Sequence, residues 1–454
     1  MRVFRAVTSI ALLGIVSLVT SCGNTQGGPT QGSVGPTAGQ PSAGARSGAQ
    51  GAGSNSGGAS GSPATTTMET SGSGGHAGDG PKDPAGTHDG GDTGDAGEGG
   101  GAGAPDDLGA NAPLSFAAPV LYRGGAWAMD IGVADLNGDG ALDVASADFQ
   151  HVSAGAFVWL NRGDGTFHAA TPYLPGQHAT AIEIGDFNGD AFPELLLVGE
   201  DDVSVLLNHG DGTFSTPSHL STGEYGALVL DADGDAKLDF LTASSLFLND
   251  GAASFSVSAG LEVGRPWVAT DLNGDGETDV LGGGRDLFVS FGAGGGAFAP
   301  RIGYATGATA LGSVARGPTV GDANLDGLPD LATAIDNDAS ASVLLNRGDG
   351  TFSAPQVYPT GRWPTAVALG DLNGDGWPEL VVANSGLGNS FTERSHYLGV
   401  HRNLGDGTFQ TQEEFFLVEF PYSVALADVD GDQKLDMVVG NGGGDLRVLL
   451  NTGH

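Results

Sequence analysis

One nine-residue pattern of acidic side chains recurs seven times between residues 135 and 436. It reads Asp-x-[Asn/Asp]-x-Asp-[Gly]-x-x-[Asp/Glu], and we number its positions 1 to 9. Side-chain oxygens at positions 1, 3, 5 and 9, with a backbone carbonyl at position 7, can converge on one hard cation. Calcium accepts about six to eight oxygens in flexible geometry. The spacing therefore predicts a calcium-binding loop in each copy, and up to seven Ca²⁺ in all.

The predicted metal ligands are the side chains at positions 1, 3, 5 and 9 of each loop. They are Asp135, Asn137, Asp139 and Asp143; Asp186, Asn188, Asp190 and Glu194; Asp231, Asp233, Asp235 and Asp239; Asp271, Asn273, Asp275 and Asp279; Asp322, Asn324, Asp326 and Asp330; Asp371, Asn373, Asp375 and Glu379; and Asp428, Asp430, Asp432 and Asp436. In three loops Ala191, Ala236 or Gln433 replaces the position-6 Gly. A left-handed backbone costs more without Gly, so we expect weaker calcium binding in those three loops.

A different metal, or no metal at all, fits these loops less well. Magnesium demands stricter octahedral geometry, and the chain has no Cys/His constellation for zinc. An EF-hand would need Glu at position 12, where the first loop has Ser146. Metal-free Asx-turns would account for one copy. They account for seven copies poorly, because the carboxylates at these positions would repel one another without cations.

The segments around the loops predict the strands that must position them. The loops recur about every 49 residues, which is the length of one four-stranded propeller blade. In the sixth unit an alternating stretch, 366–370, precedes the loop and an apolar stretch, 380–383, follows it. A third strand ends in a tight turn, as in Asn-Arg-Gly-Asp-Gly-Thr-Phe at 346–352. We therefore predict an all-β fold, a seven-bladed β-propeller with calcium-binding loops.

The two ends of the repeat region predict how the ring closes. The last unit stops at 449–454, where its tight turn and fourth strand should begin. The missing piece matches the start of the domain, because Phe-Ala-Ala-Pro-Val-Leu-Tyr at 116–122 parallels Phe-Ser-Ala-Pro-Gln-Val-Tyr at 352–358. We expect the first strand of the domain to complete the last blade, which would remove exposed sheet edges.

All seven units resemble FG-GAP/VCBS repeats, the repeats that also build the integrin α-subunit propeller. The resemblance covers about 340 residues. It implies that the calcium loops join the first and second strands on one face of the propeller. It also implies that ligands meet the opposite face, formed by the connections between strands 4 and 1 and between strands 2 and 3.

The N-terminal part of the chain predicts a lipid-anchored protein of the bacterial cell envelope. Residues 1–21 have a basic start and an apolar stretch typical of a lipoprotein signal peptide. They end in Val-Thr-Ser before Cys22, the only cysteine and the expected lipidation site. Residues 22–112 are rich in Gly, Ser, Ala and Pro and predict a disordered stalk. The propeller would occupy 113–454, tethered to the membrane at the outer membrane or cell surface.

Charge and motifs narrow the function. The formal net charge is −37, which argues against binding of nucleic acid because phosphates need Lys and Arg. No nucleophile elbow, phosphate loop or His-Glu-x-x-His motif occurs. We therefore predict a non-catalytic recognition or adhesion module for glycan or protein. The alternatives are a calcium-dependent, lyase-like polysaccharide-active enzyme and a structural partner in an envelope complex.

Aromatic side chains a few residues before the loops suggest where a ligand binds. They are Trp127, His178, Trp267, Trp363 and Tyr422. Each precedes an innermost strand, so together they are expected to surround the mouth of the central channel and to stack on a sugar or peptide. The alternative is that the rings fill the channel as core packing. Polar residues after the second strands, including Asp148, Asn384 and Asn441, are interpreted as solvated loop residues.

Overall fold

The computed structural model describes most of the chain after residue 112. The described ranges are 113–125, 127–149, 155–174, 178–199, 202–221, 226–260, 265–386, 396–417 and 419–453. The predictions for the signal peptide, Cys22 and the stalk lie outside the described residues. Within these ranges, no helix has the length and apolar character of a membrane span.

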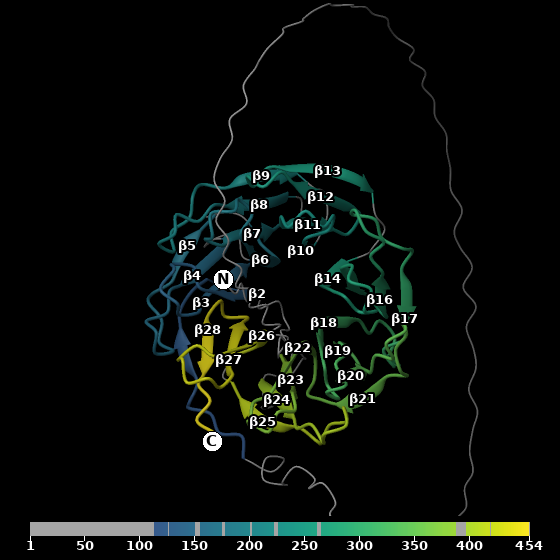
Figure 1. The fold of residues 1–454 in the computed structure, drawn as a ribbon. Helices are drawn as coiled ribbons and strands as arrows, with labels where there is room; N and C mark the ends of the chain where they lie inside the picture. The colour runs from purple at the N-terminus through teal and green to yellow at the C-terminus, as the bar shows by residue number, and fades with distance from the viewer. Residues whose placement is uncertain are drawn as a thin grey trace, which may run out of the picture. The chain divides into compact units, whose positions relative to one another are not determined.

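Seven antiparallel four-stranded sheets, the blades, surround a common axis (Figure 1). The innermost strands are β2 (Ala128–Ala134), β6 (Ala181–Gly185), β10 (Ala227–Leu230), β14 (Arg265–Thr270), β18 (Ala315–Gly321), β22 (Pro364–Gly370) and β26 (Pro421–Ala427). They belong to blades 1 to 7 in that order, and the predicted all-β, seven-bladed propeller is confirmed.

The other strands follow outward in each blade. The second strands are β3 (Asp143–Asp148), β7 (Glu194–Val198), β11 (Asp239–Thr242), β15 (Asp279–Gly283), β19 (Asp330–Ile335), β23 (Glu379–Asn384) and β27 (Asp436–Asn441). The third strands are β4 (Ala156–Trp159), β8 (Asp202–Leu206), β12 (Ser245–Asn249), β16 (Leu287–Ser290), β20 (Ser340–Leu344), β24 (Tyr397–His401) and β28 (Leu446–Leu449). The outer strands are β5 (Thr171–Tyr173), β9 (Ser218–Ser221), β13 (Phe255–Gly260), β17 (Ile302–Tyr304), β21 (Gln356–Pro359), β25 (Glu413–Phe416) and β1 (Val120–Tyr122).

The core lies between the blades, because both faces of each sheet are covered. Side chains of a strand alternate between its two faces. In β7, Leu195 and Leu197 pack into the cluster shared with blade 1, whereas Leu196 and Val198 pack into the cluster shared with blade 3. One apolar cluster fills each of the seven junctions in this way. This explains why the second strands read as continuous apolar runs.

The ring closes as predicted, with a blade built from both ends of the domain. β1 pairs antiparallel with β28, and Val120, Leu121 and Tyr122 lie opposite Val448, Arg447 and Leu446. Phe116 forms a further bridge to Asn451. Figure 1 shows the blue first strand beside the yellow last blade.

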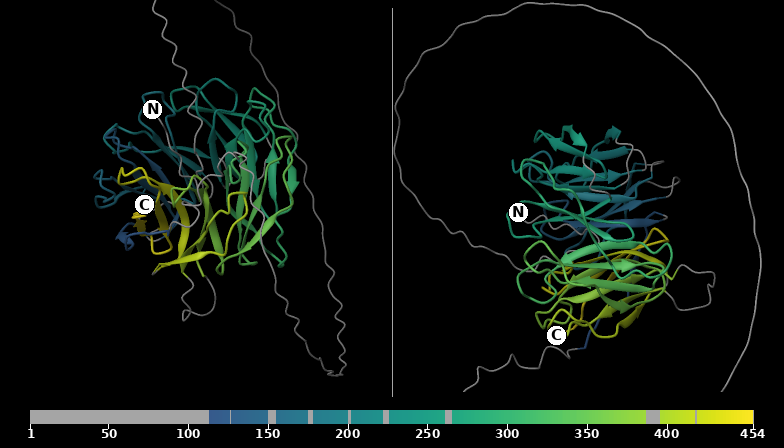
Figure 2. Two further views of the ribbon diagram at one scale, coloured as in Figure 1. Left: turned by 60° about the horizontal axis from the view of Figure 1, so that its bottom comes forward. Right: turned by 90° about the vertical axis from the view of Figure 1, so that its right-hand side faces the viewer.

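Antiparallel connections divide the propeller into two faces, which Figure 2 shows from the side. The loops from first to second strand and the turns from third to fourth strand lie on one face, which we call the lower face. The connections from second to third strand and from each blade to the next lie on the other, the upper face.

Candidate metal centres

All seven acidic loops lie on the lower face, directly after an inner strand. The residue at position 9 is the first residue of the second strand in every blade. The register holds it there, because the last residue of the inner strand pairs with it, as Ala134 does with Asp143. Each loop is therefore anchored at both ends by one β-ladder.

The position-1 carboxylate organises the loop around itself. In the first loop, Gly138 N donates to Asp135 Oδ1 at 2.7 Å, and Gly140 N donates to Asp135 Oδ2 at 2.9 Å. Ala141 N donates to Asp139 Oδ1 at 2.8 Å. Equivalent bonds recur in the sixth loop, where Asp371 accepts from the N–H groups at positions 4 and 6.

Two loop positions need a left-handed backbone. Position 6 was expected to be one, and Ala191, Ala236 and Gln433 do have φ of 75°, 67° and 71°. Position 4 was not foreseen: it is Gly in six loops, and Leu325 has φ of 53°. A non-Gly residue in this region costs about 1–2 kcal/mol, so these four loops carry local backbone strain.

The position-9 carboxyl is the buried acidic group of each loop. In the first loop Asp143 is 0% exposed; its Oδ2 accepts from Leu136 N at 2.9 Å and its Oδ1 from Asn161 N at 2.7 Å. Burial raises the pKa of this group in every blade, neighbouring loop carboxylates add to the rise, and the backbone donors oppose it. The pKa reaches about 7 in Asp143, Glu194 and Asp330, about 8 in Glu379 and about 6 in Asp436, and it is also raised in Asp239 and Asp279. At neutral pH such a group needs a proton or a cation to stay buried.

The arrangement of oxygens fits a hard cation. Carboxylate oxygens of Asp231, Asp233 and Asp239 lie within 4.8 Å of one another, as do those of Asp428, Asp430 and Asp432. In the five loops with Asn at position 3, the amide takes the place of the third carboxylate. Asn137, for example, donates from Nδ2 to Asp139 Oδ2 at 3.0 Å. These side chains offer only oxygen atoms to a cation, from carboxylates or amide carbonyls, which suits calcium or magnesium better than zinc.

An asparagine where the third strand ends links neighbouring loops, a role not foreseen from the sequence. Asn208 Nδ2 donates to the carbonyl of Leu136, at position 2 of the preceding blade's loop, at 2.8 Å. It also donates to the carbonyl of Pro193, at position 8 of its own loop, at 2.9 Å. The same pair of bonds recurs at Asn161, Asn249, Asn346, Asn403 and Asn451. We call these six residues the asparagine clasps.

Blade 4 is the exception, with Gly292 at this position. Gly292 N still donates to Asp279 Oδ1 at 2.8 Å, but the amide bonds are lost. A Cβ on Gly292 would lie 2.6 Å from the carbonyl oxygen of Thr278. The backbone at Gly292 therefore leaves no room for the side chain that the other six blades have at this position. A recurring Asn-x-Gly at the end of the third strand, present in every blade but the fourth, was the sequence signal that would have revealed these clasps.

Asn208→Ala is expected to destabilise the propeller by about 2–4 kcal/mol, because two buried carbonyls lose their donor and each loss costs about 1–3 kcal/mol. Denaturant unfolding of the variant measures this. Asn337→Ala is the matched control: Asn337 is exposed, and its amide makes one bond, to Gly312 O. Equal stability of the two variants would contradict the clasp.

The upper face brings only two of the predicted aromatic residues together. The rings of Trp127 and Tyr422 lie 5.5 Å apart between centroids, and both side chains are half-buried. Trp267, also half-buried, instead packs against the apolar cluster between blades 4 and 5, so the core-packing alternative fits this residue better. His178 contacts the ring and the carbonyl of Phe149 in blade 1. Trp363 has φ of 54°, and its carbonyl accepts from Ser385.

Phe420 belongs to the same set and was overlooked. It stands eight residues before Asp428, as Trp127 stands before Asp135. Its carbonyl accepts from Gly442 N at 2.8 Å, and its ring lies 4.2 Å from that of His396. The shared spacing was the signal that would have found it.

The polar residues that end the second strands are not solvated, which corrects that interpretation. Asp148 is 1% exposed, and Asn384 and Asn441 are 0% exposed. Asp148 Oδ2 accepts from Trp127 N at 3.2 Å. The carboxylate therefore holds the connection that enters β2, the inner strand of its own blade.

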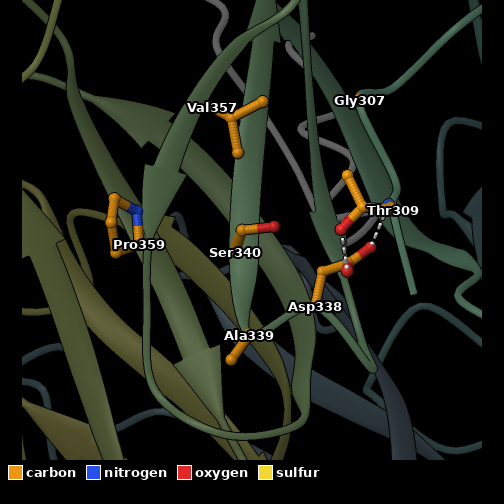
Figure 3. A pocket seen from close by; sticks show the side chains of 7 residues that line it. All are labelled: Gly307, Thr309, Asp338, Ala339, Ser340, Val357 and Pro359. Carbon is orange, nitrogen blue, oxygen red and sulfur yellow. Dashed lines mark hydrogen bonds between the residues drawn. The ribbon is translucent and has the colours of Figure 1, made fainter. Parts of the chain in front are cut away.

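A hollow of about 240 Å³ lies between blades 4 and 5 on the same face (Figure 3). It is lined by Gly307, Thr309, Asp338, Ala339, Ser340, Val357 and Pro359. Asp338 accepts from Thr309 N at 2.8 Å, Thr309 Oγ1 at 2.9 Å and Ala310 N at 2.7 Å. The Asp338 carboxylate thus holds the segment that connects blades 4 and 5, and we assign Asp338 a structural role.

These features define a class: a seven-bladed β-propeller with an acidic, cation-type loop in every blade. Models of the FG-GAP-like repeat match residues 135–197, 186–242 and 322–382, and a model of the FG-GAP repeat matches residues 420–453. The folded part of this chain is an FG-GAP-repeat β-propeller.

Individual relatives are distant. Human integrin alpha-IIb is 24% identical over 264 residues, which are 52% of this chain and 23% of the integrin chain. This chain therefore spans less than a quarter of that relative's length. Among solved structures, a lectin from Agrocybe aegerita, described by its recognition of non-reducing terminal N-acetylglucosamine, is 19% identical with a TM-score of 0.47 over 73% of this chain and 87% of the lectin. BBS1N in complex with ARL6DN is 12% identical with a TM-score of 0.49 over 75% of this chain and 97% of that chain. Likenesses of this size lead to no conclusion about function.

Proposed function

We propose that this protein is a non-catalytic recognition module, a calcium-stiffened propeller that binds glycan or protein through its upper face. The observation that carries the proposal is the Trp127–Tyr422 pair. Rings from two neighbouring blades contact each other at the upper ends of their inner strands and stay half-buried. Aromatic faces offer broad, stiff contact area for sugars or peptide side chains.

Calcium is the ion we propose for the loops. Calcium tolerates the irregular oxygen cages that nine-residue loops provide, whereas magnesium does not. Seven Ca²⁺ would bring the formal charge of −37 to −23 and would let the position-9 carboxylates stay buried in their ionised form. Because the loops lie on the lower face, the ions would support ligand binding through the order of the blades and not by direct contact.

We propose that Cys22 tethers the module to a bacterial membrane. In cells, Cys22→Ala is expected to move the protein from the membrane to the soluble fraction. A variant that stays with membranes after a carbonate wash would contradict the anchor.

The test of function is a glycan array together with an activity screen on polysaccharides, both with the full chain and calcium. Saturable binding without release of products is expected. Trp127→Ala should lower affinity at least tenfold and stability by less than about 1.5 kcal/mol, short of the ~3–5 kcal/mol of a core aromatic. Trp267→Ala is the matched control, because this half-buried ring packs against the cluster between blades 4 and 5, so its loss should lower stability and leave the affinity per folded molecule unchanged.

Two outcomes would contradict the proposal. Turnover of a polysaccharide would make the protein an enzyme of the lyase-like kind. Unchanged affinity of Trp127→Ala for every bound ligand would remove the aromatic pair from the binding face.

A further inference from the structure

One arginine on the upper face is held in place by a buried carboxylate. Arg316 lies near the upper end of β18, and its Nε donates to Asp336 Oδ2 at 3.1 Å. The Asp336 side chain is 3% exposed, whereas that of Arg316 is 41% exposed. Within the described residues, no group pairs with Nη1 or Nη2 of Arg316. The guanidinium is thus oriented through one nitrogen and keeps two for a ligand.

The Arg316–Asp336 pair presents hydrogen-bond donors to a ligand, because the acceptor oxygens of Asp336 are already used. Asp336 Oδ1 accepts from Val314 N at 2.9 Å and from Asn337 N at 2.7 Å, and Oδ2 accepts from Arg316. Since the carboxylate is occupied by these bonds, a ligand would meet the guanidinium. A planar guanidinium fork suits the two oxygens of a carboxylate.

Besides β14, whose register shifts between Pro266 and Val268, the four inner strands that follow around the ring have a bulge at their upper ends, and β18 with Arg316 is the first of them. The register shifts between Arg316 and Thr319 in β18, Pro364 and Ala366 in β22, Pro421 and Ser423 in β26, and Ala128 and Asp130 in β2. These strands follow one another around the axis (Figure 1). Bulges re-aim side chains and are over-represented beside functional sites.

Contacts between neighbouring bulges join them into one surface. A Cβ on Gly317, in the first bulge, would lie 3.0 Å from Ala366 Cα in blade 6. Thr365, the extra residue of the second bulge, donates from Oγ1 to Pro421 O at 3.1 Å. Tyr422, the extra residue of the third, meets Trp127 of blade 1. We call Arg316, Thr365, Tyr422 and Trp127 the upper arc.

The positive charge of Arg316, at one end of the upper arc, acts on Tyr422, at the other. Burial raises the pKa of the Tyr422 hydroxyl, and the Arg316 guanidinium acts to lower it. The arginine and the aromatic pair therefore share one region of the upper face, joined by the contacts between the bulges.

We propose that the upper arc binds a uronic acid residue of an acidic glycan, with Arg316 on the sugar carboxylate and the Trp127–Tyr422 pair against the pyranose ring. A hexuronate carries both features in one residue, an apolar C–H face and a carboxylate at its edge. An Asp or Glu of a peptide carries the carboxylate without the ring. The inference rests on the proposed recognition function and names its ligand class.

The test uses the full chain with calcium and measures binding by calorimetry. The probe is an oligosaccharide of alternating glucuronate and N-acetylglucosamine, and the matched probe is the same oligosaccharide with its carboxyls reduced to hydroxymethyl groups. The acidic probe is expected to bind about tenfold to a hundredfold more tightly, the range of a charge-assisted hydrogen-bonded pair. Arg316→Gln should abolish that preference and leave the affinity for the reduced probe unchanged.

Two further variants are controls, the first for a folding defect and the second for the position of the arginine. Arg316→Lys keeps a positive charge beside Asp336 but lacks the fork, so it should fold normally and lose most of the preference. Arg362→Gln removes an exposed arginine of the same face, outside the upper arc, and should change nothing.

The possible results separate this inference from the proposed function. Equal binding of both probes, unaltered in Arg316→Gln, would overturn the assignment of Arg316 and keep a glycan-binding module. Binding of peptides with no binding of either saccharide would overturn the uronate and keep a recognition module. A loss of preference in Arg362→Gln as large as in Arg316→Gln would overturn the upper arc as the site.

Discussion

Removing calcium with EGTA is expected to lower the melting temperature of the full-length protein by on the order of 10 °C, and added Ca²⁺ should restore it. An ion that binds only the folded state stabilises it by mass action. The position-9 carboxylates make the effect large, because all seven are at most 1% exposed and an ionised carboxylate is costly to bury unpaired. Magnesium should restore much less, since the loops do not impose octahedral geometry.

Variants in single loops can locate the effect. Asp371→Ala removes the carboxylate that accepts from Gly374 N and Gly376 N in the sixth loop. It should remove about 2–3 kcal/mol of calcium-dependent stability, the contribution of one site at about 100 times its Kd. Asp349→Ala is the control, because this exposed carboxylate lies in a tight turn outside the loops. A melting curve that EGTA does not change would contradict the calcium assignment.

The second large effect concerns the blade that closes the ring. Deleting residues 23–103 should leave the stability of the propeller nearly unchanged, because that segment has almost no apolar side chains to bury. Extending the deletion to Tyr122 should destabilise it by on the order of 5 kcal/mol, a large part of an ordinary stability. The extended deletion removes β1 from β28 and removes Leu114 and Phe116 from the cluster between blades 6 and 7.

Thermal unfolding of the two truncations gives the comparison. A third truncation that ends at residue 112 keeps all of β1 and should behave like the shorter deletion. Equal melting temperatures with and without residues 113–122 would contradict the split blade as a stabilising device.

Much of the fold was open to prediction because its signals are local. A nine-residue loop brings its own acidic side chains together, and the Asp at position 1 accepts from the N–H group at position 6 in every blade and from that at position 4 in six of the seven. Alternating strands and tight turns depend on near neighbours in the same way. The match between 116–122 and 352–358 then settled which strand completes the last blade.

The upper face was less predictable, because residues of other blades decide which of its side chains are buried and which are exposed. Trp127 and Trp267 looked alike in sequence and are both half-buried, yet the ring of Trp127 meets Tyr422 and that of Trp267 packs against the cluster between blades 4 and 5. Asp148 and Asn441 read as loop residues, yet both are buried. The repeat length and the spacing of residues along the chain do not specify which neighbouring blade buries a given side chain.

Residues close in the chain, and the repetition of short patterns of them, were enough to specify the number of blades, the acidic loops and the way the ring closes. The asparagine clasps and the upper arc became visible only in three dimensions. Asn161 meets Val429 across 268 residues, and Arg316, Thr365, Tyr422 and Trp127 come from four blades. Asn161 with Val429 and Trp127 with Tyr422 meet only once the ring has closed, because closure alone brings the first blade against the last.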